Sequence, residues 1–131
     1  MRAFAFVVAA VLASIVVLAD TGHLGPVLGV VESVPHGDKL AHFALMGLLA
    51  FAVSSALART HAPAAAARLG GVGVFLAVLA EEISQHWMPR RTFDLGDLAA
   101  DALGITLGAT LAYVLARRTS IRPTPASPLS P

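Results

Sequence analysis

Long apolar runs separated by short polar segments dominate the chain. Residues 3–19, 40–58 and 98–116 form three such runs of 17 to 19 residues. The only strongly polar residue within 40–58 is His42, and the only one within 3–19 is Ser14. Because a helix needs about 20 apolar residues to cross the hydrocarbon core of a bilayer, with about 17 as the lower limit, the pattern predicts three membrane-spanning helices.

A fourth span is predicted around the apolar residues 69–80, which are too few to cross a bilayer alone. The helix either begins near Ala64 and tolerates Arg68 by snorkelling, or continues past Glu82 toward Met88. Under both interpretations Glu82 lies inside the span or at its boundary.

The segments between the runs are predicted from their turn residues. Gly and Pro punctuate residues 20–38, which predicts a loop with a short turn at 27–31 against the membrane surface. The connection at 60–63 is short, so its flanking spans are expected to be antiparallel neighbours, and residues 89–96 form a second turn. The Pro-rich tail 119–131 is expected to be disordered.

Composition supports a membrane protein. Hydrophobic residues make up 56% of the 131 residues and charged residues only 13%, against about 25% in an average soluble domain. We therefore expect one four-span, all-α membrane domain over 1–118. A net charge of +1 gives no basic field for nucleic acid, and the absence of cysteine excludes disulfides and thiolate chemistry.

Orientation follows from the cationic residues beside the spans. Six lie on one side and three on the other: Arg2, Arg59, Arg68, Arg117, Arg118 and Arg122 against Lys39, Arg90 and Arg91. The bias predicts a multi-pass protein of the bacterial cytoplasmic membrane with both termini in the cytoplasm. The alternative for residues 3–19 is a cleaved signal peptide, although this run is longer than a typical hydrophobic region of such a peptide.

Titratable residues converge at the predicted outer ends of three spans. Counting about 20 residues from the cytoplasmic arginines puts His42 in the first turn of its span and Asp97 at the cap of another, with Asp101 one turn deeper. Glu82 reaches a similar depth on the third. Helical spacing also aligns several residues on one stripe, namely Asp94, Asp97, Asp101, Gly104 and Gly108. This spacing predicts that the close-packed glycine face is also the functional face, and Gly70, Gly71 and Gly73 are expected to permit a second close approach.

The pattern resembles the VanZ-like family of small bacterial membrane proteins. The matching motifs are Asp38-Lys39-x-x-His42, Glu82-x-x-Gln85, and Arg91-x-x-Asp94-x-x-Asp97-x-x-x-Asp101-x-x-Gly104-x-x-x-Gly108, within residues 17–115. The family usually carries Asn at the position of Asp101, so this chain adds a carboxylate there. The resemblance implies a role at the cell envelope, since the family is named after an accessory protein of resistance to the glycopeptide teicoplanin, but it implies no reaction.

The leading hypothesis is a site at the outer leaflet that binds an anionic lipid-linked envelope molecule. Arg91 and Lys39 would contact the anionic group, and the remaining candidates would orient or activate it: Asp38, His42, Glu82, Gln85, Asp94, Asp97 and Asp101. The partner is then a membrane lipid or a lipid-linked precursor, and no cofactor is expected.

Three other hypotheses remain open for the same residues. An enzyme acting on a lipid head group would use His42 with Glu82 or Asp101 as general base and acid. A structural or assembly helper would use the cluster only to cap and join helices, with Asp97 as an N-cap. A metal site has chemically acceptable ligands but no ligand spacing typical of one, and a transporter would need ionisable residues nearer the bilayer midplane.

Cysteine labelling tests the predicted orientation, because the chain has no background thiol. Thr92→Cys lies in the predicted outer turn, so a membrane-impermeant maleimide should label it from the outside of intact cells. Labelling that requires permeabilised cells would reverse the orientation.

Overall fold

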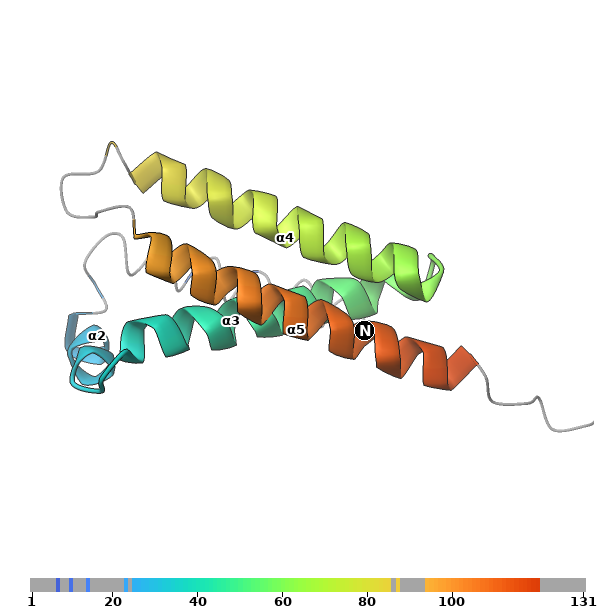
Figure 1. The fold of residues 1–131 in the computed structure, drawn as a ribbon, viewed down its shortest axis with the longest axis horizontal. Coiled ribbons are helices and arrows are strands. Elements are labelled where there is room, and N and C mark those ends of the chain that lie inside the picture. The colour runs from blue at the N-terminus through green and yellow to red at the C-terminus, as the bar shows by residue number, and fades with distance from the viewer. Residues whose placement is uncertain are drawn as a thin grey trace, which may run out of the picture.

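Four α-helices make up the part of the chain that the computed structural model describes, which is residues 7, 10, 14, 23, 25–85, 87 and 94–120 (Figure 1). They are α2 (Gly25–Glu32), α3 (Gly37–Leu57), α4 (Pro63–Gln85) and α5 (Leu95–Ser120). No strand occurs among these residues, so the all-α prediction holds for them. The first predicted span, 3–19, lies almost entirely outside the described residues.

Three of these helices have the length and composition of membrane spans. Gly37–Leu57, Pro63–Ser84 and Leu95–Ser120 have mean hydropathies of 1.9, 1.7 and 1.6. Large apolar side chains lie exposed on their outer faces, as with Leu48, Val72 and Leu103 at 51%, 58% and 66% exposed. Because apolar surface of this extent suits lipid better than water, the helices have the build of a multi-pass membrane protein.

Helices α3 and α5 run parallel and pack closely along a glycine seam. A Cβ placed on Gly104 would collide with the Phe43 carbonyl, and one on Gly108 would collide with the carbonyl of Gly47. Gly47 itself faces the Gly104 carbonyl at 3.0 Å from the position of a Cβ. Backbones can approach this closely only where side chains are absent, so the predicted close packing at Gly104 and Gly108 is confirmed.

Helix α4 runs antiparallel to both partners after the short turn that begins beyond Leu57 (Figure 1). The residues of α4 that are buried recur at every fourth position, as expected for one helical face: Ala66, Gly70, Val74, Val78 and Glu82. Gly70 contacts Ser54 of α3, and Gly71 faces Ala109 of α5. Among the described residues, none lies near the position of a Cβ on Gly73, so its predicted close approach to a neighbouring helix is wrong for this part of the chain.

Several predicted boundaries are corrected by the structure. The span predicted to begin at Leu98 begins at Leu95, because Asp94 caps it three residues earlier. Its end extends to Ser120, inside the predicted tail, where the Thr119 and Ser120 hydroxyls donate to the Ala116 carbonyl.

The N-terminal boundary of α3 and the loop before it also differ from the prediction. Helix α3 begins at Gly37, three residues before the predicted start of its span, directly after His36 with a left-handed φ of 58°. The predicted loop 20–38 contains the eight-residue helix α2. Its Pro26 lies in the first turn, where proline is tolerated. The Gly and Pro residues that predicted a loop therefore do not prevent a helix here.

The glycine seam predicts a sharp contrast between two substitutions. Gly104→Ala should lower the free energy of unfolding by about 1–3 kcal/mol, because the methyl group would force α3 and α5 apart. Gly73→Ala, the matched control, should be neutral or stabilising by up to about 1 kcal/mol through helix propensity. Denaturant titration of both variants in micelles measures this difference, and equal effects would contradict the seam.

Candidate functional site

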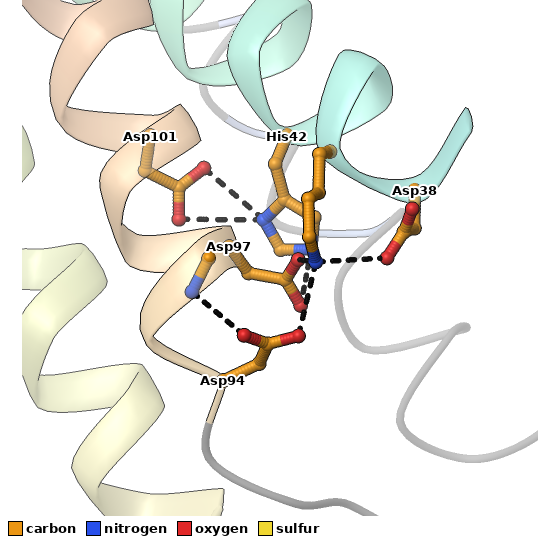
Figure 2. Close-up of polar contacts among 7 residues, drawn as sticks. Asp38, His42, Asp94, Asp97 and Asp101 are labelled. Carbon is orange, nitrogen blue, oxygen red and sulfur yellow. Dashed lines mark hydrogen bonds and ion pairs between the residues drawn. The ribbon is translucent and has the colours of Figure 1, made fainter. Parts of the chain in front are cut away.

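Lys39, in the first turn of α3, joins three carboxylates at one end of the bundle. Its Nζ lies 2.8 Å from Asp97 Oδ1, 3.0 Å from Asp94 Oδ2 and 3.2 Å from Asp38 Oδ2 (Figure 2). Gly96 makes room for the lysine, since a Cβ there would come within 2.8 Å of the Lys39 Cε. The lysine therefore ties the start of α3 to the start of α5 with all three of its donors engaged.

Asp94 is the N-cap of α5. Its Oδ1 accepts a hydrogen bond of 2.6 Å from the backbone N–H of Gly96, and its backbone carbonyl accepts from Asp97 and Leu98. The prediction that Asp97 caps this helix is therefore wrong, and Asp97 lies in the first turn instead. The Lys39 ammonium, and after it the Gly96 N–H, hold the pKa of Asp94 below its ordinary value.

His42 lies one turn below Lys39 and contacts Asp101 of α5. Its Nδ1 is 3.1 Å from Asp101 Oδ1 and 3.3 Å from Oδ2, while its Nε2 is 3.8 Å from Asp97 Oδ2 (Figure 2). The imidazole is partly exposed, whereas Asp101 is buried. This geometry, in which a buried carboxylate holds one ring nitrogen, fixes the orientation of the ring and leaves the other nitrogen free.

Glu82 is the contribution of α4 to the same end of the bundle. It is 2% exposed and lies on the buried face of α4, which packs against α3 and α5. It interacts electrostatically with His42, Asp97 and Asp101. Its Oε2 is buried and has no hydrogen-bond partner among the described residues. A buried polar group without a hydrogen bond lowers the stability of the fold. The Oε2 atom of Glu82 can still accept hydrogen bonds from a further group.

The described part of the cluster is acidic overall. Two basic side chains, Lys39 and His42, face five carboxylates: Asp38, Glu82, Asp94, Asp97 and Asp101. Lys39 was expected to contact an anionic ligand, but its ammonium donates to three of these carboxylates instead. The other predicted anion contact, Arg91, lies outside the described residues.

Three of the carboxylates, those of Asp38, Asp94 and Asp97, offer oxygens within 4.8 Å of one another, as ligands of a metal ion would. The Lys39 ammonium already lies among them, at 2.8 to 3.2 Å. The space that these three carboxylates share is therefore occupied by the Lys39 ammonium. These carboxylates thus bind a primary ammonium group in this structure.

Most of the predicted site residues meet at this end of the bundle. The depth argument brought four of them to one level, and the structure places these at the same end of the bundle: His42, Glu82, Asp97 and Asp101. Lys39 and Asp94 join them through the Lys39 ammonium. Asp38 joins them at the exposed rim. Gln85 ends α4, but its side chain is not described, and Arg91 lies outside the described residues.

Two glycines with a positional role were missed in the sequence. Gly96 admits Lys39, and Gly47 is the α3 partner of the Gly104 and Gly108 pair. The available signal for Gly47 was its position as the single glycine within the apolar run 40–58.

The sequence profile of the VanZ/LLP1 family matches residues 4–116, which is most of the chain. The chain belongs to the VanZ/LLP1 family. No curated protein and no solved structure matches it. The VanZ/LLP1 match spans α2 to α5 up to Ala116 and thus the whole described site, and it confirms the resemblance found in the sequence motifs.

Acid should remove the contribution of Asp94 to stability. Because the folded-state pKa of Asp94 is lowered, its ionised form stabilises the fold above the ordinary aspartate value of about 3.9, and this stabilisation is lost as the pH falls through the lowered pKa. Asp94→Asn should therefore unfold at a lower temperature than the natural chain at pH 7, and the difference should shrink in acid.

Asp38→Asn is the matched control for this experiment. It removes a carboxylate from the same ammonium without touching a helix cap, so its effect at pH 7 should be smaller than that of Asp94→Asn. A difference between Asp94→Asn and the natural chain that stays constant from neutral to acidic pH would contradict the assignment.

Proposed function

We propose that this membrane protein binds the polar head group of a lipid or lipid-linked envelope molecule at the end of the bundle where α3, α4 and α5 bring their charged residues together. The observation that carries the proposal is the buried Glu82 carboxylate, whose Oε2 has no partner beside a network that otherwise pairs its charges. Ionisable groups held inside a membrane bundle without a partner usually mark a ligand or ion pathway.

The exposure of the side chains supports entry from the end of the bundle. Asp38 and Asp94 are 50% and 47% exposed, His42 and Asp97 are 27% and 19%, and Asp101 is 2%. Polar groups thus continue from the rim into the interior without an apolar layer between them. A head group entering here would exchange water for hydrogen-bonding partners at each depth, which limits the cost of its desolvation.

The chemistry of the envelope suggests the ligand class. Under the proposed orientation the site faces the outer leaflet of the bacterial cytoplasmic membrane, where an anionic lipid-linked precursor would present its phosphate to Arg91 at the rim. A role in glycopeptide resistance, as the family name implies, would follow from binding such a precursor. Arginine suits this contact because its planar guanidinium pairs with phosphate through two hydrogen bonds.

Asp97→Asn tests the proposal through the lipids that stay bound to the purified protein. Native mass spectrometry of protein extracted with envelope lipids should show head-group binding by the natural chain, weakened about tenfold or more in the variant, which loses a charged hydrogen bond. His61→Ala, at the opposite end of the bundle, is the control and should bind as the natural chain does.

The helper hypothesis makes the opposite prediction for the same variant. If the cluster only joins helices, Asp97→Asn should lower the unfolding temperature and leave lipid binding unchanged. That result, in protein that remains monodisperse, would overturn the binding proposal.

A second candidate function, an enzyme acting on the bound head group, is favoured by the His42 and Asp101 pair. With Nδ1 held by a buried carboxylate, Nε2 is directed toward the less buried side, where it can take a proton from a hydroxyl or water. The pair has the orientation of a general base, and Asp97 near Nε2 would stabilise the protonated ring.

Product release distinguishes the enzyme from the binding protein. Purified protein given envelope lipids should then form a product at a rate that His42→Gln lowers about 10²- to 10⁴-fold, the usual contribution of a general base. Native mass spectrometry of the variant measures its lipid binding separately, so a loss of rate larger than the loss of binding identifies the catalytic role. Lipid binding without product in the natural chain would exclude the enzyme and leave the binding function intact.

A further inference from the structure

Two features of this end of the bundle suggest the class of ligand: an ammonium held by carboxylates, and a buried carboxyl oxygen without a partner among the described residues. Lys39 shows how this end of the bundle treats a primary ammonium, because its Nζ is held by carboxylates of Asp38, Asp94 and Asp97. Glu82 is only 2% exposed and is not among these partners. Its Oε2 accepts no hydrogen bond from the described residues. Glu82 lies on the buried face of α4, and the charges of His42, Asp97 and Asp101 act on it.

We propose that the ligand's head group carries a primary ammonium, which binds between Glu82, Asp97 and His42 as a second ammonium beside that of Lys39. This inference rests on the proposed head-group binding and names the chemical class that the site selects. Phosphatidylethanolamine and aminoacylated lipids are examples of that class.

The hydrogen-bonding capacity of the site matches such a group. A primary ammonium has three N–H donors. Three acceptors are available: Glu82 Oε2 has no partner, Asp97 Oδ2 lies 3.8 Å from the nearest imidazole nitrogen, and neutral His42 leaves Nε2 free when Nδ1 donates to Asp101. Two acceptors 3.8 Å apart can both lie within hydrogen-bonding distance of one nitrogen placed between them.

Charge favours the same class of ligand. Among the described residues of the cluster, carboxylates outnumber basic side chains, so a cationic nitrogen would reduce the excess negative charge of this part of the cluster. A trimethylammonium group offers no N–H donor and is bulkier, so it would leave Glu82 Oε2 without a hydrogen bond. A divalent cation is disfavoured because the carboxylates close enough to share one already surround Lys39, and Glu82 is not among them.

A methylation series of lipids tests the inference on the natural protein. Phosphatidylethanolamine, its mono- and dimethyl derivatives, phosphatidylcholine and phosphatidylglycerol with identical acyl chains are titrated by native mass spectrometry in the presence of EDTA. Affinity should fall stepwise with methylation, and phosphatidylcholine should bind about 10- to 100-fold more weakly than phosphatidylethanolamine, the range expected for a charged hydrogen bond.

Glu82→Gln locates the effect. The variant should lose the preference for phosphatidylethanolamine over phosphatidylcholine, whereas its binding of phosphatidylglycerol should remain as in the natural chain. Glu81→Gln removes the same charge from the neighbouring, less buried position and is the matched control, which should keep the preference. The methylation series needs no substitution, so it decides the question even if Glu82→Gln does not fold.

The outcomes separate this inference from the proposed function. Equal binding of phosphatidylethanolamine and phosphatidylcholine, or a preference for phosphatidylglycerol, would overturn the ammonium inference and leave head-group binding in place. Binding that appears only when EDTA is replaced by Mg²⁺ would likewise overturn it. Failure to bind any of the lipids or an envelope lipid extract would overturn both.

Discussion

The contact between Lys39 and the carboxylates of α5 is the constraint on which the rest of the site depends. Charges within a membrane bundle are tolerated when they are paired, and here the pairing joins two parallel helices at one end. One turn deeper, His42 and Asp101 repeat the connection, and below them the helices meet glycine to carbonyl. A polar seam thus continues into a glycine seam, and together they fix the register of α3 against α5.

Helix α4 contributes a buried carboxylate, Glu82, whose Oε2 has no partner among the described residues. The buried stripe of this helix is made of small and apolar residues until the last turn, where Glu82 takes their place. Packing alone would favour another Val or Ala there, because a buried carboxylate without a partner lowers stability. The presence of such a carboxylate beside a network whose other charges are paired suggests that a ligand supplies its partner.

The sequence predicted the location of the site well and its internal pairing poorly. Hydropathy and helical spacing brought His42, Glu82 and Asp101 to one depth, because both follow from the bilayer thickness and the helical repeat. The partners of Lys39 could not be predicted, since they depend on the rotation of α3 against α5 and on the space left by Gly96. Asp94, rather than the predicted Asp97, caps α5 because its Oδ1 accepts a hydrogen bond from the Gly96 N–H, and this local contact could not be predicted either.

The most direct measurement of the central claim is the distance between the Glu82 carboxyl carbon and a lipid head group in vesicles. Solid-state NMR with ¹³C-labelled glutamate and a ¹⁵N-labelled ethanolamine lipid measures it, with Glu82→Gln identifying the signal. The account predicts a dipolar contact of about 4 Å or less, as in an ion pair. A Glu82 carboxyl that shows no coupling to the head group while the lipid is bound would contradict it.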